Sequence, residues 1–485
     1  MLFALCLLPS ALAADTFEGQ GFYFGDPHVH TGASLDAGSS DLGTCEGSCG
    51  AAKDVIRTAK GNGLDWLAVV DHVNGRSTQS AADFTKVRDI VLAGHDPANG
   101  FVTIPGAEVW FTVPKSGPLG HRSLYFFGDD DALRTLALTD AQPAGNDRAE
   151  IRSCDNINTW MTRLSGQFGE VLLIPHHPST TLPMPTRWDC YQAAWEPAVE
   201  VYSEHGNALW EGTPVDPPGQ GTTGSGTVHY AMQPSGLGLH LGFIAGTDSH
   251  DTRPGGVCDM DTEMALHDYA GGLTAVVLRE GERFDRHAIY QAMMERRTYA
   301  TTGPRVPANI AWSVGGAQIG ALGADLTVPS GQDLMATVRV PTTWAGVVKA
   351  VNLITPESAG LAMQSDGAGG WKITVPSASV PAYLYAAITL DGRAQPDGCV
   401  DGGTSTDEWV WLSPSFITRS GAAQGAAPAV TPVAAPTTTP VPETTSAAAT
   451  AGAVGIGVVG IGGVAVLAVA GLSVGVWAFR RFRST

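Results

Sequence analysis

Two histidines separated by one residue follow a short aromatic stretch near the start of the chain, in FYFGDPHVHTGAS at residues 22–34. Junctions of this kind, where an apolar strand-like run leads directly into ionisable residues, recur along the chain. The junction residues are His28 and His30, Asp71 and His72, Glu108, His176 and His177, and Asp248 and His250. In a barrel of parallel strands the carboxyl ends meet on one face, where the active sites of such barrels lie. A single histidine at a strand end is more often structural, but the repetition predicts one shared metal site.

The mixture of ligand types indicates the chemistry. Neutral imidazoles and carboxylates without thiolates suit divalent transition ions such as Zn²⁺, Mn²⁺ or Fe²⁺, and carboxylates can bridge two or three of them. Such a cluster lowers the pKa of bound water towards about 7, so hydrolysis by metal-bound hydroxide is the predicted reaction. The order of the junctions also permits an amidohydrolase-like barrel, which often bridges its metals with a modified lysine. No lysine stands at these junctions.

Several of these segments resemble motifs of the PHP (polymerase and histidinol phosphatase) superfamily of metal-dependent phosphoesterases. The segments are DPHVHTGASLD, VVDH, GAE, GHRSLYFF, HHP and GTDSH. The resemblance implies a distorted (β/α)₇ barrel and the metal ligands His28, His30, Asp36, His72, Glu108, His121, His177, Asp248 and His250, with Asp71 beside them. Glu108 would bridge ions, and Glu108, Asp248 and His250 would take part in catalysis. His176 stays an alternative to His177.

Three further segments, VEVYSEHGN, GFIAGTDSHDTRPGG and RRTYATTGPRV, look like the branch catalogued as domain of unknown function 3604. The resemblance covers about residues 20–320. The sequence departs from the superfamily pattern at Pro27, where a leucine is usual.

Other polar residues receive weaker assignments. Glu200 ends another apolar strand and would orient a ligand histidine. Arg253 would grip a substrate phosphate with its planar guanidinium, the alternative being a salt bridge within a loop. His205 has no motif role. Three more histidines are expected to be surface or core residues, namely His229, His240 and His267.

Elements that would position the site follow from the pattern of apolar runs. Between residues 20 and 304, strand-like runs alternate with helical stretches, which is typical of a parallel α/β fold. From 305 to 418, short runs of β-formers stand between Gly, Pro and Asp turns, which predicts a small all-β sandwich.

Both ends of the chain have the composition of targeting segments. Residues 1–14 are apolar and contain Ala-Leu-Ala, which predicts a signal peptide, the alternative being a buried first element. Residues 419–450 are rich in Ala, Pro and Thr and predict an extended linker. Residues 451–479 carry no charge and precede the basic tail 480–485, which predicts a transmembrane helix with the catalytic domain outside the cytoplasm.

Charge and cysteine content restrict the partners and the compartment. The formal charge is −19, from 28 Lys and Arg against 47 Asp and Glu, so no nucleic acid is expected as a partner. A small-molecule or phosphoester substrate fits better, and the oligomeric state is not predicted. Without Cys6 an even number of cysteines remains, namely Cys45, Cys49, Cys154, Cys190, Cys258 and Cys399. Disulfides are the favoured interpretation in an exported protein, with Cys45 and Cys49 as a plausible local pair.

Three functions stay open from the sequence. The leading one is an exported, membrane-anchored phosphoesterase. The second is the same metal chemistry on a non-phosphate ester or amide bond, and the third is a non-catalytic surface binding protein that keeps the metals for stability.

Overall fold

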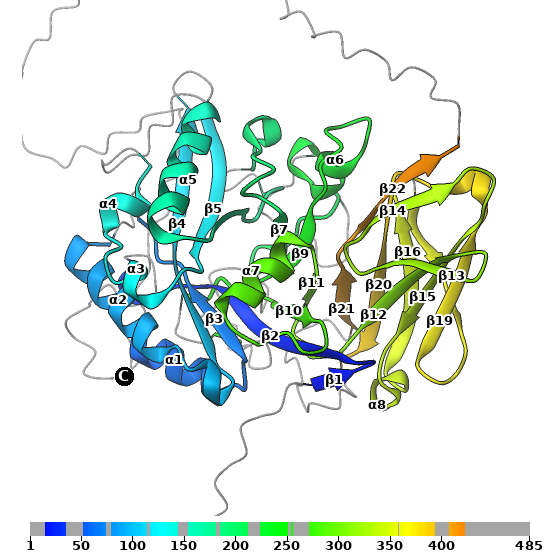
Figure 1. Ribbon diagram of the computed structural model, residues 1–485, viewed down its shortest axis with the longest axis horizontal. Helices are drawn as coiled ribbons and strands as arrows, with labels where there is room; N and C mark the ends of the chain where they lie inside the picture. Colours follow the sequence, from blue (N-terminus) through cyan, green and yellow to red (C-terminus); the bar gives the residue numbers. More distant parts are fainter. Residues whose placement is uncertain are drawn as a thin grey trace, which may run out of the picture. The chain divides into compact units, whose positions relative to one another are not determined.

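The computed structural model (Figure 1) describes eleven stretches of the chain. They are residues 15–34, 52–73, 79–113, 117–143, 154–180, 185–211, 224–250, 254–255, 271–356, 358–392 and 407–421. The predicted signal peptide, Asp36, Arg253, His267 and the predicted transmembrane segment lie outside them. Within the described residues, no helix is both long and apolar enough to span a bilayer.

Strands and helices alternate through the first part of the chain, as the apolar pattern predicts. The strands are β1 (Asp15–Phe17), β2 (Gln20–Val29), β3 (Trp66–Val69), β4 (Val102–Val113), β5 (Gly117–Phe126), β6 (Val171–Pro175), β7 (Ala198–Ser203), β8 (Gly206–Asn207), β9 (Gly242–Ala245), β10 (Leu273–Leu278) and β11 (Thr298–Thr301). The helices are α1 (Ala52–Gly61), α2 (Ala81–Gly94), α3 (Asp130–Leu133), α4 (Leu138–Ala141), α5 (Cys154–Phe168), α6 (Val228–Met232) and α7 (Arg286–Met294).

After residue 305 the described chain is mostly strand. The strands are β12 (Asn309–Val314), β13 (Ala317–Ala321), β14 (Asp325–Pro329), β15 (Leu334–Arg339), β16 (Val348–Thr355), β17 (Ser358–Ala362), β18 (Gln364–Ser365), β19 (Gly370–Val375), β20 (Tyr383–Asp391), β21 (Asp407–Leu412) and β22 (Ser415–Ser420). A short helix, α8 (Thr342–Ala345), interrupts them. The predicted mixed α/β class is therefore confirmed.

Parallel pairing in the first part is split between two sheets. β2, β3 and β4 are parallel neighbours, and β5 and β6 extend that sheet in antiparallel fashion. β7 and β9 pair in parallel within a separate three-stranded sheet. A parallel bridge between Val29 and Ser249 connects β2 to the end of β9. The strand pairings among the described residues do not close a barrel.

Helices cover these strands with apolar faces of helical spacing. Val55, Ile56 and Ala59 of α1 pack with the buried Leu67 and Val69 of β3. The buried side chains of α5 lie in one core cluster with those of β5 and β6. The buried side chains of α7 lie in another core cluster with those of β10. These apolar contacts hold the strands in place and so fix the positions of the residues at the strand ends.

The β-rich part joins the first part through a shared sheet. β21 pairs antiparallel with β11, so the large sheet continues beyond residue 305. The second sheet, of β13, β12, β15, β19 and β18, packs its inner face on the first, and Trp312, Leu334 and Leu353 lie in the core between them. Phe22 and Tyr299 from the first part belong to this same core. The described residues up to Gly421 form one compact unit.

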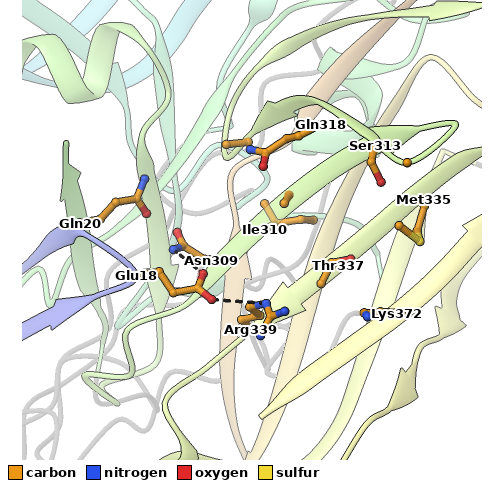
Figure 2. Close-up of a pocket in the computed structure, with 13 residues that line it drawn as sticks. Glu18, Gln20, Asn309, Ile310, Ser313, Gln318, Met335, Thr337, Arg339 and Lys372 are labelled. Carbon is orange, nitrogen blue, oxygen red and sulfur yellow. Dashed lines mark hydrogen bonds and ion pairs between the residues drawn. The ribbon is translucent and has the colours of Figure 1, made fainter. Parts of the chain in front are cut away.

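The outer face of the second sheet is polar, as strand alternation requires. It forms an open groove of about 610 Å³ that includes Ser313, Thr337 and Lys372 (Figure 2). Glu18, at the turn between β1 and β2, crosses one end of the groove. Its carboxylate accepts a hydrogen bond from Asn309 Nδ2 (3.3 Å) and pairs with Arg339 Nε (3.3 Å), which ties the β1–β2 hairpin to the sandwich.

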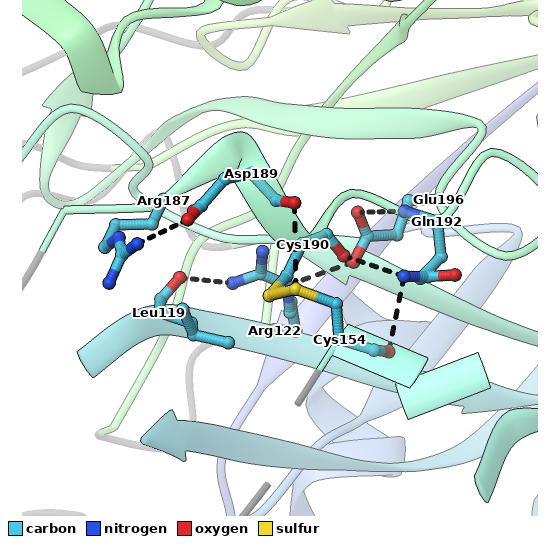
Figure 3. The surroundings of a disulfide bond; sticks show 8 residues. All are labelled: Leu119, Arg122, Cys154, Arg187, Asp189, Cys190, Gln192 and Glu196. Carbon is cyan, nitrogen blue, oxygen red and sulfur yellow. Dashed lines mark hydrogen bonds and ion pairs between the residues drawn. A yellow bond between two sulfur atoms is a disulfide. The ribbon is translucent and has the colours of Figure 1, made fainter. Parts of the chain in front are cut away.

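A disulfide joins Cys154 and Cys190 (Figure 3). It links the first residue of α5 to the short helix Trp188–Cys190 that precedes β7. Beside it the buried Arg122 Nε donates to Glu196 Oε1 at 3.0 Å. Disulfide formation is thus confirmed for this pair, and Cys45, Cys49, Cys258 and Cys399 lie outside the described residues.

Candidate metal centre

Five strands, β2, β3, β4, β5 and β9, bring predicted histidines and carboxylates together. His28 and His30 stand at the end of β2, His72 follows β3, and Asp248 follows β9. Glu108 lies where the parallel pairing of β4 with β3 ends, since His72 and Glu108 form the last parallel bridge. His121 comes from the start of β5, and because β5 runs antiparallel to β4, its start lies at the same end of the sheet. The convergence expected of parallel strand ends therefore holds here.

Four ligand atoms meet at the centre of the cluster. His28 Nε2 and His30 Nε2 lie 3.2 Å apart. Asp248 Oδ1 lies 3.2 Å from the first and 3.1 Å from the second, and Glu108 Oε2 lies 3.4 and 3.3 Å from them. All four side chains are buried. Two imidazoles and two carboxylates that point at one another form a donor set that suits a divalent cation.

Both carboxylates turn their second oxygen towards other histidines. Glu108 Oε1 lies 2.6 Å from His121 Nδ1, which in turn lies 3.0 Å from His177 Nε2. Asp248 Oδ2 lies 3.1 Å from both His176 Nε2 and His205 Nε2. The ligand atoms of His30, His72 and His250 form a further group, within 4.8 Å of one another. The two oxygens of each carboxylate therefore face two different groups of histidines.

Hydrogen bonds behind the histidines fix which nitrogen faces the centre. Glu200 accepts the Nδ1–H of His28 at 3.0 Å with one oxygen and that of His176 at 2.6 Å with the other. This leaves Nε2 of both rings directed at Asp248. His30 Nδ1 donates to Ser34 Oγ at 3.0 Å in the same way. Partners of this kind set the tautomer and orientation of metal-binding histidines and raise their basicity.

Backbone geometry around Asp248 is unusual and tightly held. Asp248 has φ 57° and His177 has φ 31°, in the left-handed region that few non-glycine residues adopt. Asp248 N donates to the His28 carbonyl at 2.9 Å, so β9 lies against β2 at this point. A side chain at Gly246 would place its Cβ 2.7 Å from the Cβ of His28, so only glycine permits this approach.

The carboxylate of Asp26 stabilises the same turn through hydrogen bonds. Its buried carboxylate accepts hydrogen bonds from Thr247 N (3.0 Å), Thr247 Oγ1 (2.6 Å) and Gly255 N (3.0 Å). Burial raises the pKa of Asp26 to about 6, although these hydrogen bonds oppose the rise. Asp26 therefore connects the first motif to the segment that carries Asp248.

Electrostatics show how strongly the groups depend on one another. Burial would lower the pKa of His30, but hydrogen bonds and charge from Asp248 and Glu108 outweigh it and raise that pKa to about 10. At His121 burial prevails and lowers the pKa to about 4. Burial would raise the pKa of Asp248, yet the charge of His28 holds it well below its usual value. Positive charge on the imidazoles thus balances the carboxylates, and divalent cations would supply the same balance. The buried clusters could bind metal.

Asp71 has partners within the protein. Its carboxylate accepts hydrogen bonds from Thr31 N (2.6 Å), Thr31 Oγ1 (2.8 Å) and Ser34 Oγ (3.1 Å). Because Ser34 also contacts His30, Asp71 supports the loop that holds a candidate ligand, and the direct role of Asp71 as a ligand stays a prediction.

The structure thus brings together most of the predicted ligands. The residues that meet in the cluster are His28, His30, His72, Glu108, His121, His177, Asp248 and His250. His176, the alternative to His177, lies there as well, and so does Glu200, in the orienting position that its strand suggested. Asp36 and Arg253 lie outside the described residues.

Sequence reasoning missed His205. It follows the apolar strand β7 and Glu204, which is the same kind of junction that identified the other histidines, so the rule would have found it. His229 is buried elsewhere, against Tyr385, and His240 is stacked on Phe416, in agreement with the core and surface roles expected for them.

Comparison with known proteins gives one family match. The family described as "Protein of unknown function (DUF3604)" matches residues 247–337, a stretch that starts at the Thr247–His250 segment and ends in β15. This match supports the assignment to that branch but covers less than half of the chain. No curated protein matches the sequence.

Proposed function

We propose that the protein is an exported, membrane-anchored metal-dependent hydrolase that acts on phosphate esters. One observation carries the proposal: Glu108 and Asp248 each direct their two oxygens at different histidine groups. Shared carboxylates of this kind support two or three neighbouring ions, and multi-ion sites are suited to phosphoester hydrolysis because they stabilise both the attacking and the leaving oxygen.

The side chains divide naturally among ion positions. His28, His30, Glu108 and Asp248 would hold one Zn, Mn or Fe ion, and Glu108 with His121 and His177 a second. Asp248 with His176 and His205 offers a further position. When bound, such ions would lower the pKa of water and neutralise charge on phosphoryl oxygens.

The chain's own groups would orient the reaction. Asp248 faces both histidine groups and would hold the attacking water in place. His250 Nδ1 donates to the Asp248 carbonyl at 2.7 Å, so Nε2 is the atom that would bind an ion or exchange a proton. Its side chain is 12% exposed, compared with 0% for His28 and His30, so substrate would approach from the side of His250.

Strand contacts support a distorted (β/α)₇ barrel of the PHP type as part of this proposal. The parallel groups β2–β3–β4 and β7–β9 meet at the Val29–Ser249 bridge, and Leu173 N in β6 donates to the Trp195 carbonyl just before β7. The disulfide supports export, since such bonds persist in oxidising compartments.

The test is a substrate panel with the full-length protein purified in detergent and loaded with Mn²⁺ or Zn²⁺. We expect phosphate esters to be hydrolysed and elemental analysis to find about one to three ions per chain. The His28→Ala, His30→Ala double variant should lose both. Turnover of only carboxylic esters or amides would favour the second function, and bound metal without any turnover would favour a surface binding protein.

A further inference from the structure

Trp110 is the large aromatic side chain beside the metal centre. It lies in β4 two residues after Glu108, so strand alternation places both side chains on the same face. Its cross-strand partner in β5 is His121. The indole stacks on the His121 imidazole, with ring centroids 4.6 Å apart and planes inclined by 13°, and meets His72 edge to face at 5.2 Å.

Trp110 differs from its apolar neighbours in the same strand. Val109 and Phe111 point to the opposite face, where both are fully buried in the core beneath α5. Trp110 instead remains partly exposed, while its contacts His72 and His121 are each only 4% exposed. A tryptophan needed only for packing would gain more by complete burial.

The exposed side of the cluster is marked by two groups. Trp110 and His250 flank His72, with ring centroids 5.2 and 6.3 Å from it, and both are more exposed than the histidines behind them. A ligand that approaches Glu108 beside His72 would lie next to the indole. Binding sites commonly combine such an aromatic wall with a few convergent polar groups.

We propose that Trp110 binds the aromatic ring of an aryl phosphate, which makes it a specificity-determining residue for the hydrolase proposed above, on which this inference rests. The indole is stacked directly on the His121 ring, and His121 Nδ1 lies 2.6 Å from Glu108 Oε1. This short reach fits a ring bonded directly to the ester oxygen. A ring at the end of a long linker would lie beyond the indole.

The experiment measures binding without turnover. Full-length protein loaded with Mn²⁺ is titrated calorimetrically with phenylphosphonate and with methylphosphonate, whose carbon–phosphorus bonds are not hydrolysed. We expect Trp110→Ala to weaken phenylphosphonate about three- to tenfold, the range of an aromatic stacking contact, and to leave methylphosphonate nearly unchanged. Trp110→Phe should keep most of the preference. Trp409→Ala is the control, because Trp409 is also partly buried and stacked, on Trp411 in β21.

Each other outcome contradicts a specific step. Equal weakening of both phosphonates, or loss of manganese in Trp110→Ala, would mean that Trp110 only supports His121. Unchanged binding of both would exclude ring contact. If both phosphonates bind with the expected preference but no ester is hydrolysed, the ring site stands and the hydrolase proposal fails. If the wild-type protein binds neither phosphonate although the substrate panel shows hydrolysis of phosphate esters, the ring site is wrong and the hydrolase proposal stands.

Discussion

At the ends of β2, β3 and β9 and within β4 the protein buries histidines and carboxylates in contact with one another, whereas between the two sheets after residue 305 it buries tryptophan, leucine and valine. Burying charged groups costs free energy even when they are paired, while burying apolar surface is the main source of stability. The ionisable groups that could bind metal are therefore concentrated in one part of this compact unit, and much of the apolar burial that stabilises it lies in another.

The two regions are not independent, because they share a sheet and a core. β11 connects them through β21, and Phe22 and Phe24 at the start of β2 lie in the sandwich core, a few residues before His28. The apolar region therefore anchors the strand that presents the candidate ligands His28 and His30. Substitutions in the polar region should change metal binding and turnover, and substitutions in the apolar region should change unfolding.

The largest effect is expected at Asp248. In Asp248→Asn the shape and one oxygen remain, but the negative charge shared between His28, His30, His176 and His205 is lost. Turnover on the phosphoester found in the panel should fall by about 10³-fold or more, since several kcal/mol of charge stabilisation disappear. The melting temperature should change little, because the apolar cores are untouched.

A matched control is Asp89→Asn, which removes an exposed carboxylate on α2 that pairs only with its neighbour Arg88 in the described contacts. It should behave as wild type. Near-normal turnover in Asp248→Asn would remove Asp248 from the catalytic machinery and would favour the surface binding protein.

The opposite behaviour is expected from Leu334→Ala in β15. Leu334 is fully buried between the sheets, so truncation should reduce the free energy of unfolding by about 2–5 kcal/mol while the metal content of the folded protein stays the same. Met335, the next residue, points to the outer groove and is only partly buried. Denaturant titration of Met335→Ala should show a much smaller loss, and equal losses would contradict the assignment of inner and outer faces.

The residues of the candidate metal centre were predictable where a local pattern marks them. An ionisable residue directly after an apolar strand is visible in the sequence, which is why His28, His72 and Asp248 could be identified. Whether a carboxylate faces an ion or a neighbouring hydroxyl depends on residues distant in the chain. The partners of Asp71 are such a case, since they come from the loop after β2.

Long-range pairing was the part of the fold without a local signal. The mixed α/β class followed from alternating runs, but nothing in the sequence around Tyr299 indicates that it pairs with Leu412, more than a hundred residues later. The joining of the two regions into one sheet is therefore a property that sequence periodicity does not report.

A smaller effect, dependent on pH, is expected where the two regions meet. His229 in α6 lies 2.9 Å from the hydroxyl of Tyr385 in β20, and burial lowers the pKa of His229 to about 4. The unfolded chain binds this proton near 6.5, so between pH 6.5 and 4 it binds more protons than the folded chain. Stability should therefore be complete above pH 6.5 and fall by up to about 3 kcal/mol towards pH 4.

Urea titrations of wild type and His229→Gln across that range would isolate the contribution, because the other histidines titrate in both proteins. The variant should lose less stability on acidification. Parallel curves would show that this contact does not couple protonation to the joining of the regions.

The smallest effect concerns Glu200, whose two oxygens accept from Nδ1 of His28 and Nδ1 of His176. In Glu200→Gln only one oxygen can accept, so one of the two rings loses its partner and its fixed orientation. We expect affinity for Mn²⁺ or Zn²⁺, measured by competition with a chelator, to fall about 10- to 100-fold, as is usual when such a partner is removed.

Glu196→Gln is the matched control, because Glu196 is equally buried, stands four residues earlier and pairs with Arg122. That variant should destabilise the fold by leaving Arg122 without its counter-charge, yet bind metal as tightly as wild type. If the two variants lost metal affinity equally, the effect would be a general loosening of the fold, and the assignment of Glu200 as the group that orients His28 and His176 would be wrong.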